Sequence, residues 1–221
     1  MPNAVRTAPS QFRWTKQPSR PRKIERQNPK GTDPVKNYRL SIKLLEIEPP
    51  IWRSLAVPGT VSLAKLHSIL QKVMGWDNYH IYLFNVGRRQ YGEGVSEWAD
   101  FAQAVVNAKR VMLQDIAPRK GARFIYTYDL GDGWEHELRV EEIHEGEPDQ
   151  VRCLDGARSC PPEDCGGPHG YGELLEIIFD PRHPEYQARR DWLGEGFDPE
   201  LFNVEIVNRR LKRLKVAREA A

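Results

Sequence analysis

The chain has 221 residues, of which 39% are hydrophobic and six are Trp, so it can bury one core and is not wholly disordered. No apolar run approaches the roughly 20 residues that cross a bilayer, and the first residues contain no apolar segment followed by a cleavage site. We therefore expect one soluble, cytoplasmic domain with extensions and no membrane partner.

The net charge of +2 conceals an uneven distribution of charge along the chain. Residues 1–37 carry nine Lys/Arg and two acidic residues, and residues 208–221 carry six Lys/Arg and one acidic residue. The two ends are thus +7 and +5, which leaves −10 for residues 38–207. Basic ends attract phosphate polymers, but they are also common as solubilising tails, so both interpretations stand.

Residues 1–36 are predicted to form a disordered basic arm, because Pro, Gln, Ser and Lys/Arg follow one another there without an apolar period. Residues 37–216 are predicted to form one α+β domain. Apolar and polar residues alternate in it at 38–47, which predicts a strand, and again at 51–58, where Pro58 ends a second strand.

The next elements follow from caps and periodicity. Ser62 is a predicted N-cap and Gly75 a predicted stop for a helix whose apolar face includes His67. Further predicted elements are a strand at 80–84, a helix at 97–110, a strand-like segment at 111–116, a hairpin over 123–143, a loop without regular structure at 146–170, and helices at 171–180, 184–194 and 203–214.

Three histidines are predicted to point inward. The period of two places His136 on one strand face with Trp134, His67 lies on the apolar face of its helix, and His80 shares a face with two aromatic residues. They could line a pocket, or each could be a hydrogen-bonded histidine of the core.

The three cysteines are concentrated in the predicted loop, as Cys153, Cys160 and Cys165. Zinc favours sulfur and nitrogen ligands, so three thiolates with His136 or His169 as the fourth ligand could bind it. The chain has no close C-x2-C pair, and the alternative is three free thiols in a loop stiffened by proline.

Acidic residues accompany the turn and the loop. Asp129 and Asp132 lie in a Gly-rich turn, where Asp usually accepts hydrogen bonds from backbone N–H groups. Glu163 and Asp164 stand between Pro-Pro and Gly-Gly, where they could cap a turn or bind a partner. The order of residues does not fit a calcium loop, a P-loop or a Ser-His-Asp triad.

The last predicted helix carries a basic cluster. Arg209, Lys212 and Arg213 fall on one helical face with Arg210 beside them, while Leu211 and Leu214 can dock on the domain. The docked helix would hold these four positive charges in fixed positions, so the four cations are the predicted contacts to nucleic acid.

Four strings occur in a characteristic order: PPIWR at 49–53, LHSILQKVMGW at 66–76, YDLGDGWEHEL at 128–138 and CPPEDCGGPHGY at 160–171. Over about residues 37–212 the chain resembles the Ri-plasmid open-reading-frame-three family, the plasmid pRiA4b ORF-3-like proteins, which includes insertion-element passenger proteins labelled TnpR. The resemblance implies an α+β roll and an association with mobile elements, and it implies no established reaction. A serine recombinase would need Tyr-x-Arg-x-Ser, and Tyr38, Arg39 and Ser41 are one residue too close, so we reject that chemistry.

The sequence therefore predicts a single roll-like α+β domain with a mixed or antiparallel sheet packed by helices. It favours a binding module of plasmids or mobile elements that contacts nucleic acid through its basic ends, or a protein partner. The alternative is a zinc-dependent, hydrolase-like enzyme that uses His136 and the cysteine-rich loop. The residues expected to line the main cleft are Trp52, Arg53, His67, His80, Asp129, Asp132, Trp134, His136 and Asp164.

Overall fold

Strand β1 (Val35–Leu44) begins the part of the chain that this computed structural model describes, residues 34–93 and 105–214. It pairs with β2 (Trp52–Pro58) as an antiparallel hairpin, so both predicted strands are present. The other edge of β1 pairs with β7 (Trp134–Gly146). Residues 1–33 of the predicted arm lie outside the described residues, whereas Val35 and Lys36, predicted to belong to the arm, are part of the strand.

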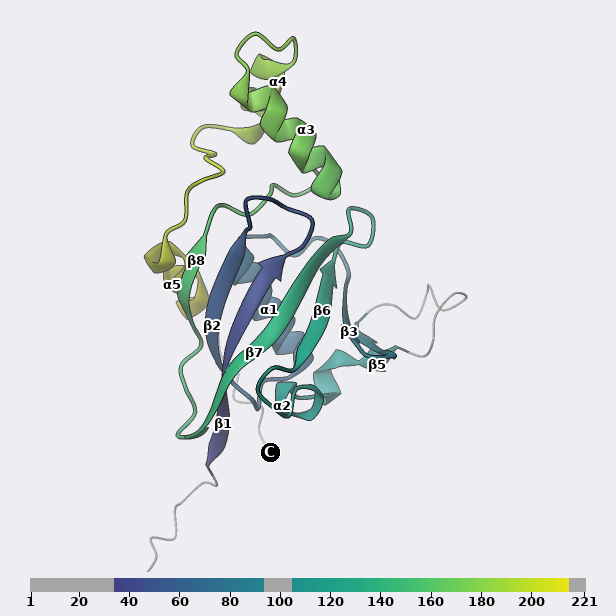
Figure 1. The fold of residues 1–221 in the computed structure, drawn as a ribbon, viewed down its shortest axis with the longest axis vertical. Coiled ribbons are helices and arrows are strands. Elements are labelled where there is room, and N and C mark those ends of the chain that lie inside the picture. Colours follow the sequence, from purple (N-terminus) through teal and green to yellow (C-terminus); the bar gives the residue numbers. More distant parts are fainter. Residues whose placement is uncertain (1–33, 94–104, 215–221) are drawn as a thin grey trace, which may run out of the picture. The chain divides into compact units, whose positions relative to one another are not determined.

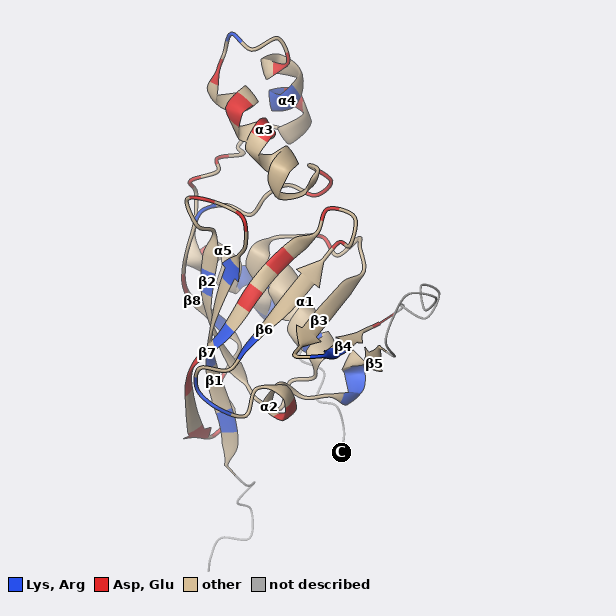
Figure 2. Ribbon diagram, turned by 45° about the vertical axis from the view of Figure 1, so that its right-hand side comes forward, with Lys and Arg blue, Asp and Glu red and all other residues tan. Residues whose placement is uncertain are grey.

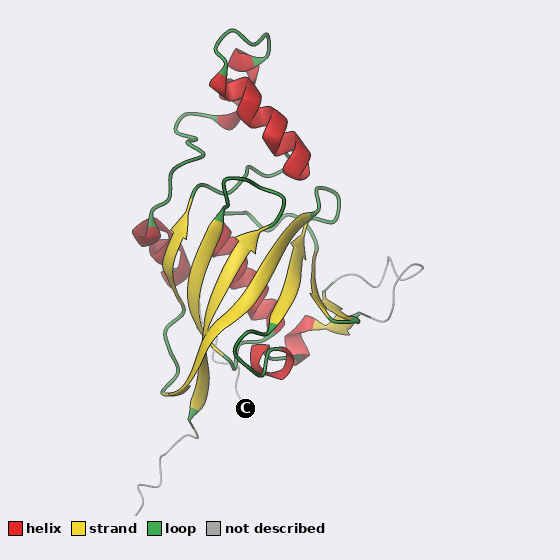
Figure 3. Cartoon of the chain, viewed as in Figure 1, coloured by secondary structure: helices red, strands yellow, loops and turns green. Residues whose placement is uncertain are grey.

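The described strands form one eight-stranded sheet in the order β5-β4-β3-β6-β7-β1-β2-β8 (Figures 1 and 3). Neighbours are antiparallel except β4 and β5, so the sheet is mixed and the predicted α+β fold is confirmed. The remaining strands are β3 (Tyr82–Val86), β4 (Arg89–Gly92), β5 (Val106–Asn107), β6 (Arg123–Tyr128) and β8 (Arg152–Ala157).

Helix α1 (Leu63–Met74) lies across one face of the sheet (Figure 1). The Ser62 side chain accepts a hydrogen bond from the Lys65 N–H, and Gly75 ends the helix at φ 114°, so both predicted boundaries are confirmed. The other helices are α2 (Leu113–Ile116), α3 (Gly167–Phe179), α4 (Tyr186–Leu193) and α5 (Val204–Lys212), with a 3-10 turn at Ala108–Arg110. In the described residues, no helix is long and apolar enough to cross a bilayer.

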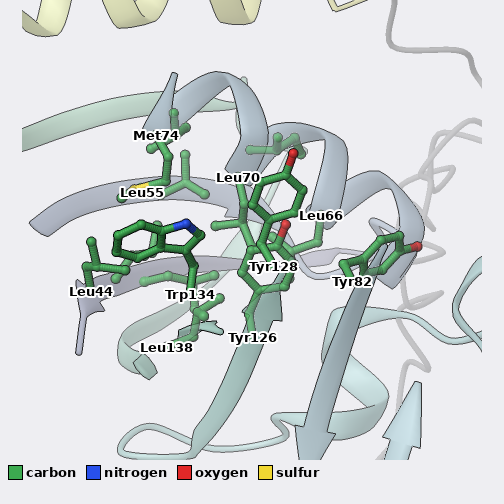
Figure 4. Close-up of a cluster of buried hydrophobic side chains, with 14 of the residues drawn as sticks. Leu44, Leu55, Leu66, Leu70, Met74, Tyr82, Tyr126, Tyr128, Trp134 and Leu138 are labelled. Carbon is green, nitrogen blue, oxygen red and sulfur yellow. The ribbon is translucent and has the colours of Figure 1, made fainter. Parts of the chain in front are cut away.

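The core lies between α1 and the β6–β7 hairpin. Trp134, Tyr126 and Tyr128 point from the hairpin toward Leu66 and Leu70 of α1 (Figure 4), and all five residues are fully buried. A buried aromatic side chain removes 150–250 Å² from water, so this cluster makes a large share of the hydrophobic stabilisation.

Three predictions for the middle of the chain differ from the structure. Residues 111–116 contain the short helix α2 rather than a strand, because Asp115 accepts a hydrogen bond from the Met112 N–H and starts a turn. The predicted loop at 146–170 contains β8, which pairs with β2 through a bulge. Of the predicted helix at 97–110, residues 97–104 lie outside the described residues, and the described remainder contains β5 and the 3-10 turn instead of an α-helix.

Helix α5 packs beside β8 and bonds to its backbone at Cys153. Asn203 caps it by accepting hydrogen bonds from two backbone N–H groups. The Asn208 side chain accepts a hydrogen bond from the Cys153 N–H (2.9 Å) and donates one to the Cys153 carbonyl (2.8 Å). Val207 and Leu211 are buried against the domain, so one face of α5 is fixed.

Candidate functional site

Three predicted cleft residues, His80, Asp129 and Asp164, meet at the end of the sheet where β6 stops. The His80 Nε2 atom lies 3.0 Å from Asp164 Oδ1 and 3.6 Å from Asp129 Oδ2. One ligand atom from each of the three side chains lies within 4.8 Å of the others. We refer to these three residues as the His–Asp cluster.

Asp129 is the fixed member of the His–Asp cluster. It follows β6 at φ 54°, a left-handed conformation that Asp adopts more readily than most residues. Its Oδ1 accepts a hydrogen bond from the Gly131 N–H (2.9 Å), and its backbone bonds to Ile81 and Gly133. Its side chain is only 10% exposed, so its second oxygen, Oδ2, is held beside His80.

Glu163 anchors the loop that carries Asp164. Its Oε1 accepts hydrogen bonds from the Asp77 N–H (2.9 Å) and the Tyr128 hydroxyl (3.0 Å). Burial, and then the neighbouring Glu163 carboxylate, raise the pKa of Tyr128, so this phenol stays protonated and donates. Farther along the loop, Asp132 Oδ2 accepts a hydrogen bond from the Gly166 N–H (3.1 Å). Asp164 itself has φ 56°.

His67 and His136 belong to the core and not to the His–Asp cluster. His67 bonds through Nδ1 to the Tyr126 hydroxyl (2.8 Å) and through Nε2 to Asn78 (2.6 Å). His136 and Trp134 are fully buried, and His136 Nδ1 lies 3.2 Å from the Tyr126 carbonyl oxygen. Burial lowers the pKa of both imidazoles to about 4.

Arg53 is a structural clamp. Its buried guanidinium donates hydrogen bonds to the backbone carbonyls of Val73 (3.2 Å), Trp52 and Ala157 (2.7 Å each) and Arg158 (2.8 Å). These acceptors tie β2 to the end of α1 and to β8. Trp52 is half-buried on β2 and contributes its backbone to the same clamp.

The cysteines do not converge with His136. Of the His, Cys, Asp and Glu side chains in residues 34–93 and 105–214, the His–Asp cluster is the group of three whose ligand atoms meet, and no thiol belongs to it. Cys153 is fixed on β8, whereas Cys160 and Cys165 lie in the loop that follows. Burial raises the pKa of all three thiols, that of Cys165 to about 12, which disfavours thiolates.

A hollow of about 370 Å³, a volume within the usual range for small-molecule sites, is lined by Glu163 but by none of the three residues of the His–Asp cluster. The end of α1, the loop at 159–163 and residues 192–210 line it, with Trp76 and Trp192 among the apolar side chains and Arg210 among the cations. Asp77 and Glu163, which join the loop to the α1 end, also line this hollow.

The outer face of α5 carries the predicted basic cluster. Arg209, Arg210, Lys212 and Arg213 are all exposed, and none has an ion-pair partner in the described part of the chain. Lys72, in the last turn of α1, joins Arg210 and Arg213 around a small hollow of about 210 Å³. We refer to these five cations as the basic surface.

Sequence reasoning missed the residues that position the His–Asp cluster. Tyr128 reads as an ordinary strand aromatic, and Asp77 as a polar residue after a helix. Their link to Glu163 joins residues that are 35 and 86 positions apart, so no local spacing could have revealed it.

Comparisons with known proteins agree with the fold. A family model described as plasmid pRiA4b ORF-3-like protein matches residues 36–206. An uncharacterised protein, y4hQ of Sinorhizobium fredii (strain NBRC 101917 / NGR234), is 36% identical over 187 residues, which are 82% of this chain and 95% of the relative. The crystal structure of MM3350, a protein of unknown function from Methanosarcina mazei Go1, is 33% identical with a TM-score of 0.67, and covers 77% of this chain and 97% of its own.

Proposed function

Because the chain belongs to the plasmid pRiA4b ORF-3-like protein family, whose two relatives described above have no assigned activity, we propose a function from its own surface. The protein is a nucleic-acid-binding module that contacts phosphates through the basic surface of α5 and the end of α1. One observation carries this proposal: four exposed cations, which have no ion-pair partner among the described residues, stand on α5 and its C-cap, and the opposite face of this helix is buried.

The anchoring of α5 gives these charges a fixed geometry. Val207 and Leu211 are 5% exposed, and the two hydrogen bonds of Asn208 fix the helix to β8. A cation held in place loses less conformational freedom when it meets a phosphate than one on a mobile chain. The anchored helix therefore favours contacts between particular cations and particular phosphates over a general electrostatic attraction to nucleic acid.

Several cations on the sheet, by contrast, are paired with carboxylates. On the sheet, Arg39 pairs with Glu142 (3.0 Å) and Arg123 with Glu137 (3.3 Å). Figure 2 shows red and blue segments close together along these strands. Because residues 38–207 sum to −10, most of this region is a poor surface for a polyanion, and we expect the attraction to be strongest at the basic surface and the chain ends.

The test compares two variants with the same change in charge. In the first, Arg209, Arg210, Lys212 and Arg213 are replaced by Gln. In the control, four exposed cations that also have no ion-pair partner in the described residues are replaced by Gln: Arg88, Arg89, Arg119 and Lys120. Fluorescence anisotropy would measure the binding of a labelled DNA duplex and a single-stranded RNA at about 50 and 200 mM salt.

We expect the α5 variant to lose most of its affinity and the control to keep it. Each phosphate contact adds about 0.9 to the slope of log affinity against log salt for duplex DNA, so the slope should fall by about 3 to 4 in the α5 variant. An equal loss of affinity in both variants would mean that the overall charge of the protein, and not the basic surface, determines binding. No binding by the unmodified protein at low salt would refute the proposal.

A further inference from the structure

The geometry points to a site for a divalent first-row transition-metal ion in the His–Asp cluster, with the imidazole of His80 and the carboxylates of Asp129 and Asp164 as ligands. The inference is independent of the proposed nucleic-acid contact. It uses residues that the sequence placed in a cleft, but in a combination that the sequence did not predict.

The distances suit an ion. Ligand atoms that lie about 2.0–2.1 Å from a tetrahedral metal are separated from one another by about 3.3 Å. The measured separations from His80 Nε2, 3.0 Å to Asp164 and 3.6 Å to Asp129, lie on either side of that value. Small side-chain rotations would therefore bring all three atoms into a coordination sphere.

The lone pairs at the centre of the cluster are not used by the protein. The His80 Nε2 atom is buried but makes no hydrogen bond to any described residue, so its 3.0 Å approach to Asp164 is a contact without hydrogen-bond alignment. Asp129 is nine-tenths buried, yet only its Oδ1 accepts a hydrogen bond. A buried ring nitrogen without a hydrogen-bond partner is costly, and a cation between His80 Nε2 and the carboxylates would remove that cost.

Charge balance favours a cation at the same point. Two carboxylates face the imidazole, and no Lys or Arg of the described residues pairs with either of them. Asp164, whose side chain is 67% exposed, leaves the cluster open to solvent, so an ion can enter from that side.

The side chains of the His–Asp cluster are held by further hydrogen bonds, as metal ligands in proteins commonly are. The Gly131 N–H fixes the Asp129 carboxylate, and Glu163 fixes the loop that bears Asp164. Such outer hydrogen bonds orient ligands and set their affinity. One nitrogen and two oxygens suit ions such as Mn²⁺ or Zn²⁺, and three protein ligands leave positions for water or a further ligand.

Mn²⁺ is the first probe, because thiolates select Zn²⁺ and other soft ions, whereas carboxylates suit Mn²⁺. Full-length protein is stripped with a chelator and titrated with Mn²⁺ by calorimetry, and its Tm is measured at about 100 times the dissociation constant. We expect one ion per chain and a Tm rise of about 5–10 °C. Zn²⁺ is titrated in parallel.

The variants are His80→Gln, Asp164→Asn and, as a matched control, Glu173→Gln, since the Asp164 and Glu173 side chains are 67% and 65% exposed. We expect the two ligand variants to bind Mn²⁺ at least about tenfold more weakly and the control to bind it unchanged. Asp129→Asn retains an oxygen acceptor for Gly131 and tests the buried ligand without breaking the turn.

Three results would overturn the inference. Absence of saturable Mn²⁺ and Zn²⁺ binding would leave His80 as a partner of two carboxylates only. Zn²⁺ binding that His80→Gln and Asp164→Asn do not weaken would place the ion elsewhere, for example on the thiols. Equal weakening in Glu173→Gln would mean that surface charge, and not coordination, attracts the ion.

Discussion

Burial separates the three histidines that the sequence predicted to point inward. His67 and His136 have less than a tenth of their surface exposed, whereas the His80 side chain is 30% exposed and lies between two carboxylates. His67 also stacks on Tyr82, with ring centroids 3.6 Å apart, and both of its ring nitrogens have hydrogen-bond partners. It therefore packs as a core residue, and the interpretation as a core histidine is the one that its environment supports.

Folding should depend on pH through these two buried rings. In the unfolded chain an imidazole binds a proton near pH 6.5, whereas the folded rings do so only near pH 4. Above pH 6.5 neither state is protonated, and stability is unaffected by these groups. As the pH falls from 6.5 to 4 the unfolded state gains protons first, so each ring removes up to about 3 kcal/mol of unfolding free energy.

Urea unfolding between pH 7.5 and 4 measures this effect. In His67→Gln, whose amide can still bond to Asn78 and Tyr126, the loss of stability with falling pH should be shallower by about one proton. His169→Gln removes an exposed imidazole and should follow the unmodified protein. A His67→Gln profile that runs parallel to the unmodified one would show that His67 is protonated in the folded state as readily as in the unfolded chain.

The sequence could predict which residues of the candidate site point inward, but not how they meet. Strand periodicity placed His136 correctly beside Trp134, and both proved to be fully buried. His80 precedes β3 and does not belong to it, because periodicity alone does not locate the start of a strand. Asp129 and Asp164 meet only because the loop after β8 returns to the β6–β7 turn, a tertiary contact without a local signal.

Among the elements, α3 depends on a close backbone approach at its first turn. Gly167 has φ 69°, and a Cβ there would lie 2.3 Å from the Asp132 carbonyl oxygen. This contact fixes the start of α3 against the β6–β7 turn, near Asp164. Gly172, later in the same helix, has no atom within 4 Å of the position that a Cβ would take.

Two glycine substitutions in α3 should therefore have opposite effects. Gly167→Ala adds the strain of a left-handed residue, about 1–2 kcal/mol, and a clash with backbone that cannot move freely, so we expect a lower Tm. Gly172→Ala should raise stability by about 0.5–1 kcal/mol, because Ala favours the helix interior. Thermal unfolding checks both. A Gly167→Ala protein as stable as the unmodified one would mean that α3 does not need this approach.

Most elements could be predicted from the sequence, because local chemistry fixes their ends. Ser62, Gly75 and Asn203 set helix boundaries through hydrogen bonds or a left-handed turn that these residue types favour. Strand β8 could not be predicted, since Cys153 is the one residue of its six that is fully buried, and no period of two results. Its pairing with β2 and its contact with α5 create the strand.

On the scale of the whole molecule, residues 1–33 precede the folded domain, whose first strand starts at Val35. The solved relative MM3350 is matched over 97% of its length by 77% of this chain. Residues 1–33 contain eight Lys/Arg and two acidic residues. We therefore expect the domain to fold without these residues and to lose only long-range attraction to polyanions.

Deletion of residues 1–33 tests this expectation. The Tm should change by less than about 2 °C, the shift that less than about 1 kcal/mol produces in a domain of this size. Binding to DNA at low salt should weaken, while substitution of the α5 cations should still have its own effect. Deletion of residues 1–39 is the control, because it also removes the buried Asn37 and Tyr38 and should destabilise the domain. A large drop in Tm for the shorter deletion would contradict the expectation.

The contact between Asn208 and Cys153 also bears on self-association. The outer edge of a sheet presents free N–H and C=O groups, which can pair with a strand of a second molecule and seed aggregation. At Cys153 both groups are already bonded to one side-chain amide, which takes the place of a neighbouring strand. At the opposite edge, β5 has only two residues. The described sheet therefore ends in one border that is interrupted at Cys153 and in another that is very short, which shortens the template that either offers to another copy.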